Sequence, residues 1–421
     1  MTTLTFKHVA GEKRLVEKGG AGDDQNVFGS KKGSTMKIAW KRGLLGLIGI
    51  AAILGGGALY REWIQAREAS FLKQCRAATA ASQWEDLQGL GANWTKWHPQ
   101  SAQAWVFRAD AAQHLGDFAA AASYLEEIPL SDPKGLPARV SLAALQFGTL
   151  NRPLDGARTC EQILAIEPRT TSAHQQLIEF FALTLQRKRL DYQIRYAIEC
   201  SREPPQSYVY MYLMDTMRLA SGVELNSRWI AAYPDTELYQ VAQVLQLPEP
   251  ESGVKNGQGT DKYSLAESLL ARYPTNLELL AYQLDLSIRR GNVAEVLAIL
   301  QRLPPEADED SRFWRAKGWL HLSREELRKA RESLEQAIRL YPQDRNARAW
   351  LADVFRREGK LTEAEPLHEI VQFSRGLRDR ITALGSSPKI PREILQDLAD
   401  FAEKCGDFPI AKGLKHRLQP R

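Results

Sequence analysis

Histidine and cysteine, the residue types best suited to metal binding and nucleophilic chemistry, are sparse in this sequence of 421 residues. None of the seven histidines lies in an HExxH motif, and no histidine and cysteine have the spacing of a zinc site. The chain also lacks GxSxG, and it has no strand pattern that could carry GxGxxG. We therefore predict that the protein is not an enzyme and that it holds no cofactor and no metal ion.

Two cysteines and two histidines fall on packing positions of a repeat that is described below. At these positions we expect Cys75 and Cys160 to be small buried thiols. We expect His321 and His368, at positions for large packing residues, to be core histidines. The cysteines lie far apart and form no CxxC pair. A disulfide between Cys160 and Cys200 is the alternative that the sequence leaves open.

The elements that must position these residues come from a unit of 34 residues, two copies of which stand back to back in Ser311–Arg378. In the first copy the recurring residues, at unit positions 4, 8, 20, 24, 27 and 32, are Trp314, Gly318, Ala330, Leu334, Ala337 and Pro342. In the second copy, at positions 7, 8, 11, 15, 20 and 27, they are Leu351, Ala352, Phe355, Gly359, Ala364 and Val371. Positions 4, 7, 8 and 11 form a stripe on a first helix, and positions 20, 24 and 27 form a stripe on a second. We expect Gly359 to adopt a left-handed conformation between the two helices, and Pro342 to stop a second helix.

This spacing resembles the tetratricopeptide repeat, whose pattern is W-x2-L-G-x2-Y…A-x3-F…P. The resemblance implies stacked helical hairpins that bind other proteins without catalysis. Each hairpin buries only part of its apolar surface and needs neighbours. We predict an all-α, right-handed superhelical solenoid of about ten such hairpins, preceded by one transmembrane helix.

The repeat units divide the chain into an N-terminal array at 64–247 and a C-terminal array at 263–421. The clearest early unit is Ala102–Gly135, and the last hairpin is Arg392–Pro420. The stretch 248–262 is rich in proline and glycine and contains no GK[ST], so it is not a phosphate-binding loop. We interpret it as an insertion between two helices of one unit. A hinge between two subarrays is the alternative.

An uncharged segment of 18 residues, Gly43–Tyr60, precedes the repeats. As a helix it would span roughly 27 Å, about the thickness of a bilayer core. Trp40 lies at one edge, and Tyr60 and Trp63 lie at the other, where aromatic rings prefer the headgroup region. We predict a transmembrane helix at 43–63. A cleaved signal peptide is the alternative, although the basic lead of 42 residues is long for one and Ala-x-Ala is absent.

The charges before this segment indicate its orientation. Residues 1–42 carry nine Lys and Arg and four Asp and Glu, which leaves 47 of each sign in the remaining residues. The positive-inside rule then predicts a single-pass protein of the inner membrane, with 1–42 as a disordered cytoplasmic tail and the repeats outside the cytoplasm. An organellar receptor with a cytosolic array is left open. The balanced charge beyond residue 42 argues against a nucleic-acid partner.

Unit positions 2, 5, 9 and 12 of the first helices line the concave face in the family that the chain resembles. In the two late copies we predict that these positions form a groove for an acidic peptide, with the residues Arg312, Arg315, Trp319, Asn346, Asp353 and Arg356. Arg312, Arg315 and Asn346 resemble part of the carboxylate clamp that some family members use on C-terminal peptides. The preceding unit has Glu278 and Asp285 where that clamp needs Lys and Asn, so ordinary surface arginines are the alternative.

One N-terminal span followed by such repeats resembles accessory factors of secretion and envelope assembly. The resemblance implies a membrane-anchored scaffold or adaptor that assembles or chaperones envelope proteins. The alternative is a non-catalytic regulatory subunit of a membrane enzyme or export complex. The expected partners are proteins or peptides and, through Gly43–Tyr60, the membrane. We expect no nucleic acid and no small-molecule substrate.

Overall fold

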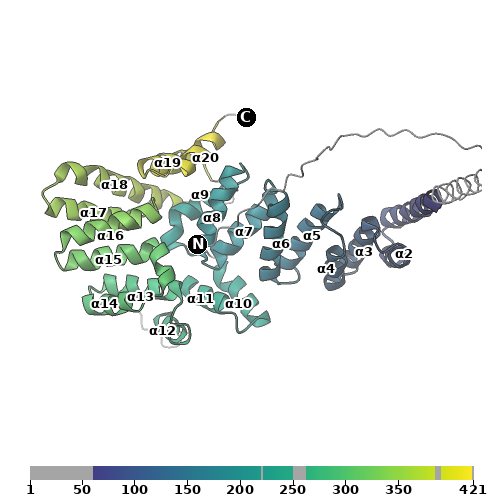
Figure 1. Ribbon diagram of the computed structural model, residues 1–421, viewed down its shortest axis with the longest axis horizontal. Helices are drawn as coiled ribbons and strands as arrows, with labels where there is room; N and C mark the ends of the chain where they lie inside the picture. The colour runs from purple at the N-terminus through teal and green to yellow at the C-terminus, as the bar shows by residue number, and fades with distance from the viewer. Residues whose placement is uncertain (1–59, 220, 250–261, 385–389, 420–421) are drawn as a thin grey trace, which may run out of the picture. The chain divides into compact units, whose positions relative to one another are not determined.

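The computed structural model describes residues 60–219, 221–249, 262–384 and 390–419 (Figure 1). Within these ranges the regular secondary structure is entirely helical, so the prediction of an all-α fold is confirmed. The predicted tail, all but the last residue of the apolar segment, and most of the loop at 248–262 lie outside the described residues. No helix in the described ranges is both long enough and apolar enough to cross a membrane.

The chain divides into two compact units, Met1–Leu72 and Lys73–Arg421. The first described helix covers residues 60–80. The helices that follow are α2 (Trp84–Trp97), α3 (Ala102–His114), α4 (Phe118–Glu126), α5 (Gly135–Phe147), α6 (Pro153–Ile166), α7 (Thr171–Leu183), α8 (Arg187–Glu199), α9 (Gln206–Leu213), the 3-10 helix η1 (Met214–Thr216), α10 (Gly222–Ala232) and α11 (Glu237–Gln246). After them come α12 (Lys262–Arg272), α13 (Leu277–Arg289), α14 (Val293–Gln301), the 3-10 helix η2 (Pro305–Glu309), α15 (Ser311–Ser323), α16 (Leu327–Leu340), α17 (Arg345–Arg357), α18 (Leu361–Ala383), α19 (Arg392–Lys404) and α20 (Phe408–Arg417).

The late hairpins form as the 34-residue pattern predicts. Gly359 has a φ of +77° in the turn between α17 and α18, and α16 ends at Leu340, two residues before Pro342. Leu334 is fully buried between α15 and α16, and an added Cβ at Gly318 would lie 2.5 Å from its Cγ. The two helices can therefore cross closely only because position 318 has no side chain. The predicted packing positions at Gly318, Ala330, Leu334 and Ala337 are confirmed, because all four residues are buried, whereas Trp314 is half-buried.

The prediction of buried thiols is confirmed, and the prediction of core histidines is not. Cys75 and Cys160 are buried as predicted, and Cys160 and Cys200 are both free thiols, which contradicts the alternative disulfide. The prediction of core histidines is wrong, because His321 and His368 are only half-buried. The reason for His321 is an ion-pair partner at the helix surface, since its Nδ1 lies 2.8 Å from Glu326 Oε2.

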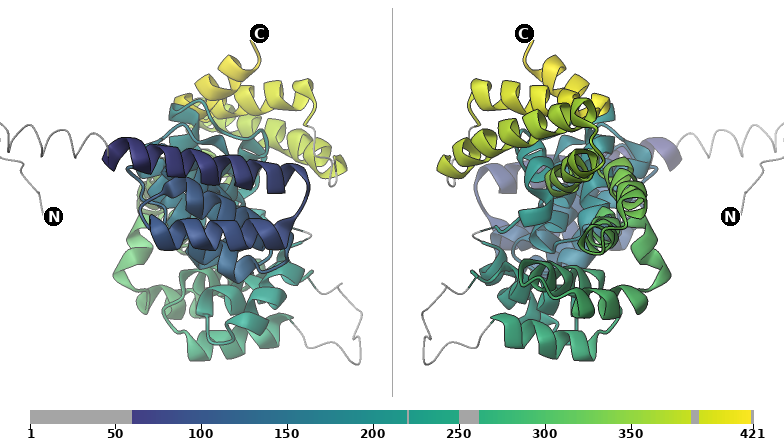
Figure 2. Two further views of the ribbon diagram at one scale, coloured as in Figure 1. Left: turned by 90° about the vertical axis from the view of Figure 1, so that its right-hand side faces the viewer. Right: turned by 90° about the vertical axis from the view of Figure 1, so that its left-hand side faces the viewer.

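The second unit closes on itself. Helix α20 packs on α8 and α19 packs on α9, so the last hairpin meets the middle of the array (Figures 1 and 2). One hydrophobic core includes Leu190 and Tyr212 from the middle together with Phe401 and Leu414 from the end. Residues on both sides of the loop at 248–262 therefore share one core. The periodic pattern contains no signal for this closure.

Candidate functional site

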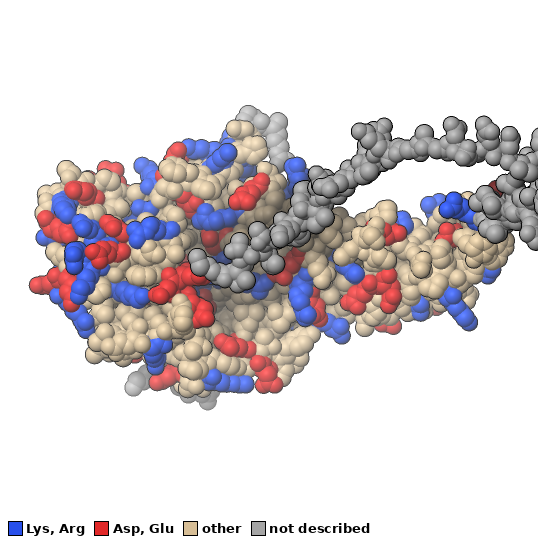
Figure 3. Space-filling view, viewed as in Figure 1, with Lys and Arg blue, Asp and Glu red and all other residues tan. Residues whose placement is uncertain are grey.

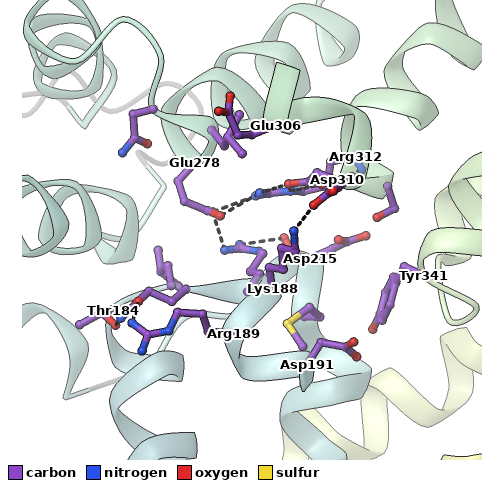
Figure 4. Close-up of a pocket in the computed structure, with 18 of the residues that line it drawn as sticks. Thr184, Lys188, Arg189, Asp191, Asp215, Glu278, Glu306, Asp310, Arg312 and Tyr341 are labelled. Carbon is purple, nitrogen blue, oxygen red and sulfur yellow. Dashed lines mark hydrogen bonds and ion pairs between the residues drawn. The ribbon is translucent and has the colours of Figure 1, made fainter. Parts of the chain in front are cut away.

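The candidate site lies where the ends of helices from distant parts of the second unit meet. Two pockets adjoin there. The first, of about 330 Å³, is lined by segments of 184–191, 214–215, 238–241, 276–278, 306–312 and 340–341, and we call it the acidic pocket (Figure 4). The second pocket has a volume of about 250 Å³, and we call it the basic pocket. It is lined mainly by segments of 215–218, 278–289 and 312–315, and single residues from other segments, among them Asn346 and Arg378, complete the lining. The two pockets share part of their wall.

The shared wall is the centre of an ion-pair network with three arginines. Arg187 and Arg312 line both pockets, and Arg315 lines only the basic pocket. We call this whole network, with its carboxylate partners, the wall. Arg312 forms a bidentate pair with Glu278, with both N–O distances at 2.8 Å, and its Nε donates to Asp310 Oδ1 at 3.0 Å. Arg187 also donates to Glu278, at 2.7 Å. Because one carboxylate accepts from two guanidinium groups, α8, α13 and α15 are tied together at their first turns.

The third arginine, Arg315, joins two carboxylates that are far apart in the sequence. Its Nη1 lies 2.5 Å from Asp215 Oδ2 and 2.7 Å from Asp344 Oδ2. Asp215 lies in η1, and Asp344 precedes α17 as its N-cap, where it accepts a hydrogen bond from the amide of Ala347 at 2.9 Å. The carboxylates of this wall thus stand mostly at helix N-termini, where the helix dipole favours negative charge.

The wall is buried, and its electrostatics follow from that burial. Burial alone would raise the pKa of Asp215, but the guanidinium groups of Arg315, Arg187 and Arg312 together outweigh this effect and hold that pKa below its ordinary value. Asp344 has a fully buried side chain, and burial raises its pKa to about 6 even though Arg315 partly offsets the effect. The same balance lowers the pKa of Asp310, where Arg312 outweighs burial.

The wall contains the three arginines and four carboxylates, so it carries one carboxylate more than it has guanidinium groups. Asp215 and Asp344 compete for the single Arg315, and Asp215 raises the pKa of Asp344 through its negative charge. Asp344 therefore takes up a proton more readily than Asp215 and Asp310, whose pKa values are lowered. This arrangement is a structural ion-pair network whose charge is sensitive to pH.

The six residues of the predicted peptide groove are only partly brought together. Arg312, Arg315 and Asn346 line the basic pocket, whereas Trp319 and Asp353 line a separate shallow depression. Arg356 donates to the carbonyl of Ala352 on its own helix at 3.3 Å. Arg312 and Arg315 already have carboxylate partners, and Glu278, which stands where the clamp needs a different residue, is the partner of Arg312. Peptide binding by the six residues stays a prediction.

Sequence reasoning missed Arg187, Asp215 and Asp344, which complete the network. It also missed Arg218 and Arg378, which line the basic pocket. Asp344 and Arg378 both stand at unit position 34, the last position of each copy in Ser311–Arg378, whereas Asp215 and Arg218 lie in the irregular middle of the chain. Position 34 alone does not mark a residue as part of the network or the pocket, so only the folded array, which brings these segments together, identifies them.

Models of the tetratricopeptide repeat match three parts of the chain. One model matches residues 70–135 and 315–369, and a second matches residues 255–320. These segments are tetratricopeptide repeats. The match at 315–369 falls within the pair of copies at Ser311–Arg378, so the resemblance drawn from the sequence is confirmed for these segments. Proteins with such repeats are in general non-catalytic scaffolds that bind other proteins, and this is the class that the fold supports.

The solved structures that resemble the chain are distant. The Cut9–Hcn1 hetero-tetramer of the APC/C is 14% identical, with 84% of this chain and 78% of that chain covered and a TM-score of 0.32. Human IFIT1, in a dimer with m7Gppp-AAAA, is 14% identical, with 82% and 88% covered and a TM-score of 0.32. A tetratricopeptide repeat protein from Parabacteroides merdae is 11% identical, with 61% and 99% covered and a TM-score of 0.29. At these scores the likenesses carry no argument about the site. In a comparison with curated proteins, no sequence matches the chain.

The remaining chemistry of the described residues gives no second candidate. Within the described ranges no three His, Cys, Asp or Glu side chains are grouped so that they could hold a metal ion. Lysine and arginine alternate with aspartate and glutamate over the face shown in Figure 3, without a broad patch of one sign. The two pockets and their shared wall are therefore the site on which a functional proposal can be built.

Proposed function

We propose that this protein is an adaptor that is anchored in the inner membrane by the apolar segment at 43–60 and holds partner proteins on its repeat array outside the cytoplasm. The observation that carries the proposal is the meeting of at least six separate chain segments around the acidic pocket, in an array that contains tetratricopeptide repeats. Partner binding at such a point would contact many hairpins at once and would favour the closed array, because a ligand that binds one state stabilises it. The partners that we propose are envelope proteins that the adaptor assembles or chaperones.

Two exposed aromatic side chains support the anchor. Tyr60 and Trp63 are 63% and 50% exposed, and their ring centroids lie 6.1 Å apart in a stacked arrangement. The guanidinium group of Arg67 lies 5.4 Å from the ring centroid of Trp63. Aromatic rings followed by a cation, directly after an apolar segment, suit the interface between lipid and water.

Site-specific crosslinking in cells tests the adaptor. A photoreactive residue replaces Glu306, which is exposed and lines the acidic pocket, or Glu369, which is exposed on α18 and lies outside both pockets. We expect a discrete protein adduct from position 306 of the full-length chain and a weak adduct or none from position 369. Equal adducts at both positions, or none at 306, would contradict the proposal.

Two further measurements address the membrane. In spheroplasts, added protease should digest the array while a tag at residue 1 stays protected; protection of the array would contradict the proposed orientation. Exchange of residues 43–60 for an unrelated span should leave the adducts at 306 intact. Loss of the adducts after this exchange would instead favour a regulatory subunit that docks through its span.

A further inference from the structure

The basic pocket has a clear excess of positive charge. Seven Lys and Arg side chains and four Asp and Glu side chains of the described residues line it. Most of the cations have partners in the chain. Glu278 pairs with Arg187 and Arg312, Asp215 pairs with Arg315, Glu249 pairs with Lys262, and Asp285 pairs with Arg289. Arg218 and Arg378 remain, and neither forms an ion pair with another residue that the structure describes.

These two arginines come from different elements that are fixed against each other. Arg218 follows η1, and Arg378 lies on α18. The hydroxyl of Tyr212, in the helix that leads into η1, donates to the backbone carbonyl of Ser374 at 2.5 Å. Ser374 lies one turn before Arg378 and therefore on the same side of α18. The two segments that carry the unmatched guanidinium groups are thus held in position before any ligand arrives.

We propose that the basic pocket binds carboxylate side chains of an acidic segment in the partner polypeptide, and that Arg218 and Arg378 are the residues that pair with them. The proposal rests on the protein-binding function given above and assigns the chemistry of the partner. Arginine suits this role because its planar guanidinium group can donate two parallel hydrogen bonds to one carboxylate. Asn346, exposed in the same pocket, can donate a further hydrogen bond from its amide.

The size of the pocket favours part of a larger molecule as the occupant. Its volume of about 250 Å³ is smaller than the roughly 300–1,000 Å³ that is usual for sites of whole small ligands. A nucleic acid would need a continuous basic track for successive phosphates, whereas the chain beyond residue 42 has balanced charge. One or two carboxylate side chains of a polypeptide match both the volume and the two unmatched arginines.

The test measures binding of a fluorescein-labelled polyglutamate peptide to the full-length chain in detergent by fluorescence anisotropy. We compare wild type with the double variant Arg218→Glu/Arg378→Glu and with the milder Arg218→Gln/Arg378→Gln. The matched control is Arg324→Glu/Arg375→Glu, which changes the net charge equally at two exposed arginines outside both pockets, one of them on the same helix α18. We expect both pocket variants to bind at least about tenfold more weakly and the control to bind like wild type.

Four results would overturn the inference. They are a lack of polyglutamate binding by the wild-type chain, wild-type affinity in the pocket variants, an equal loss of affinity in the control, and tighter binding of an oligoadenylate RNA than of polyglutamate by the wild-type chain. Because Arg218 and Arg378 are exposed, circular dichroism should show all variants folded. If peptide binding fails while the crosslinks at position 306 persist, the assignment of an acidic partner segment is wrong and the adaptor function is unaffected.

Discussion

The contact that closes the array can be tested by replacing one side chain, Asp407. Its carboxylate is 1% exposed and accepts from both terminal nitrogens of Arg195, at 2.9 and 3.0 Å. It also accepts from Gln343 Nε2 at 3.1 Å. These bonds join the N-cap residue of α20 to α8 and to the segment before α17. We therefore expect Asp407→Ala to loosen the last hairpin rather than to unfold the whole array.

The magnitude follows from burial. Removing one partner of a buried ion pair costs about 3–5 kcal/mol, because the remaining charge is left without compensation. Arg195 is 26% exposed and keeps a second partner, Asp191, at 3.0 Å. The cost should therefore fall at the lower end, at about 3 kcal/mol. The apolar contacts of Phe401 and Leu414 with the shared core remain in the variant.

Hydrogen exchange followed by mass spectrometry measures this loss locally, and it does not require the repeat array to unfold in one step. Amides of α19 and α20 should exchange about a hundredfold faster in Asp407→Ala, while those of α3 and α4 should not change. In the double variant with Arg195→Ala the two costs should be less than additive. Asp353→Ala is the control, because it removes an exposed pair with Arg357 that should contribute less than about 1 kcal/mol. Unchanged exchange in α19 and α20 would refute the role that we give to the ion pair.

Three further predictions concern the wall and the hairpins. Because the pKa of Asp344 is raised to about 6 in the folded chain, ionisation of its carboxyl group lowers the free energy of unfolding. This loss of stability is absent below the unfolded-state pKa of about 4 and is complete above pH 6. Asp344→Asn should therefore gain stability relative to wild type as the pH rises from 4 to 7 in urea titrations, and a difference that stays constant with pH would contradict this. Gly318→Ala should destabilise the array by about 1–3 kcal/mol in thermal unfolding, because its Cβ would lie 2.5 Å from Leu334, and a neutral effect would show that α15 and α16 can separate without cost. Gly376→Ala on α18 should instead stabilise by about 0.5–1 kcal/mol, because nothing lies within 4 Å of the new methyl group and glycine weakens a helix interior; a loss of stability there would mean that this side of α18 is covered.

The irregular middle of the chain is where sequence reasoning was least informative. Asp215 lies in a 3-10 helix of three residues, and Arg218 follows it without a repeat position. Both residues line the basic pocket with side chains of α15 and α18. Their partners are set by distance in the folded chain, and no spacing along the chain encodes that distance. For the same reason Arg312 and Arg315 could be located in a repeat from the sequence, but their carboxylate partners could not all be named.

What the sequence by itself determined is the local architecture: the hairpins, the left-handed turn at Gly359 and the end of α16 before Pro342. These features depend on backbone sterics and on neighbours within about one repeat, so a periodic pattern carries them completely. Only the tertiary structure decided that α20 returns to α8 and that Arg315 lies between Asp215 and Asp344. The reason is that the small rotation between successive hairpins accumulates over the array. This accumulated rotation decides which charged groups come close enough to a buried charge to pair with it.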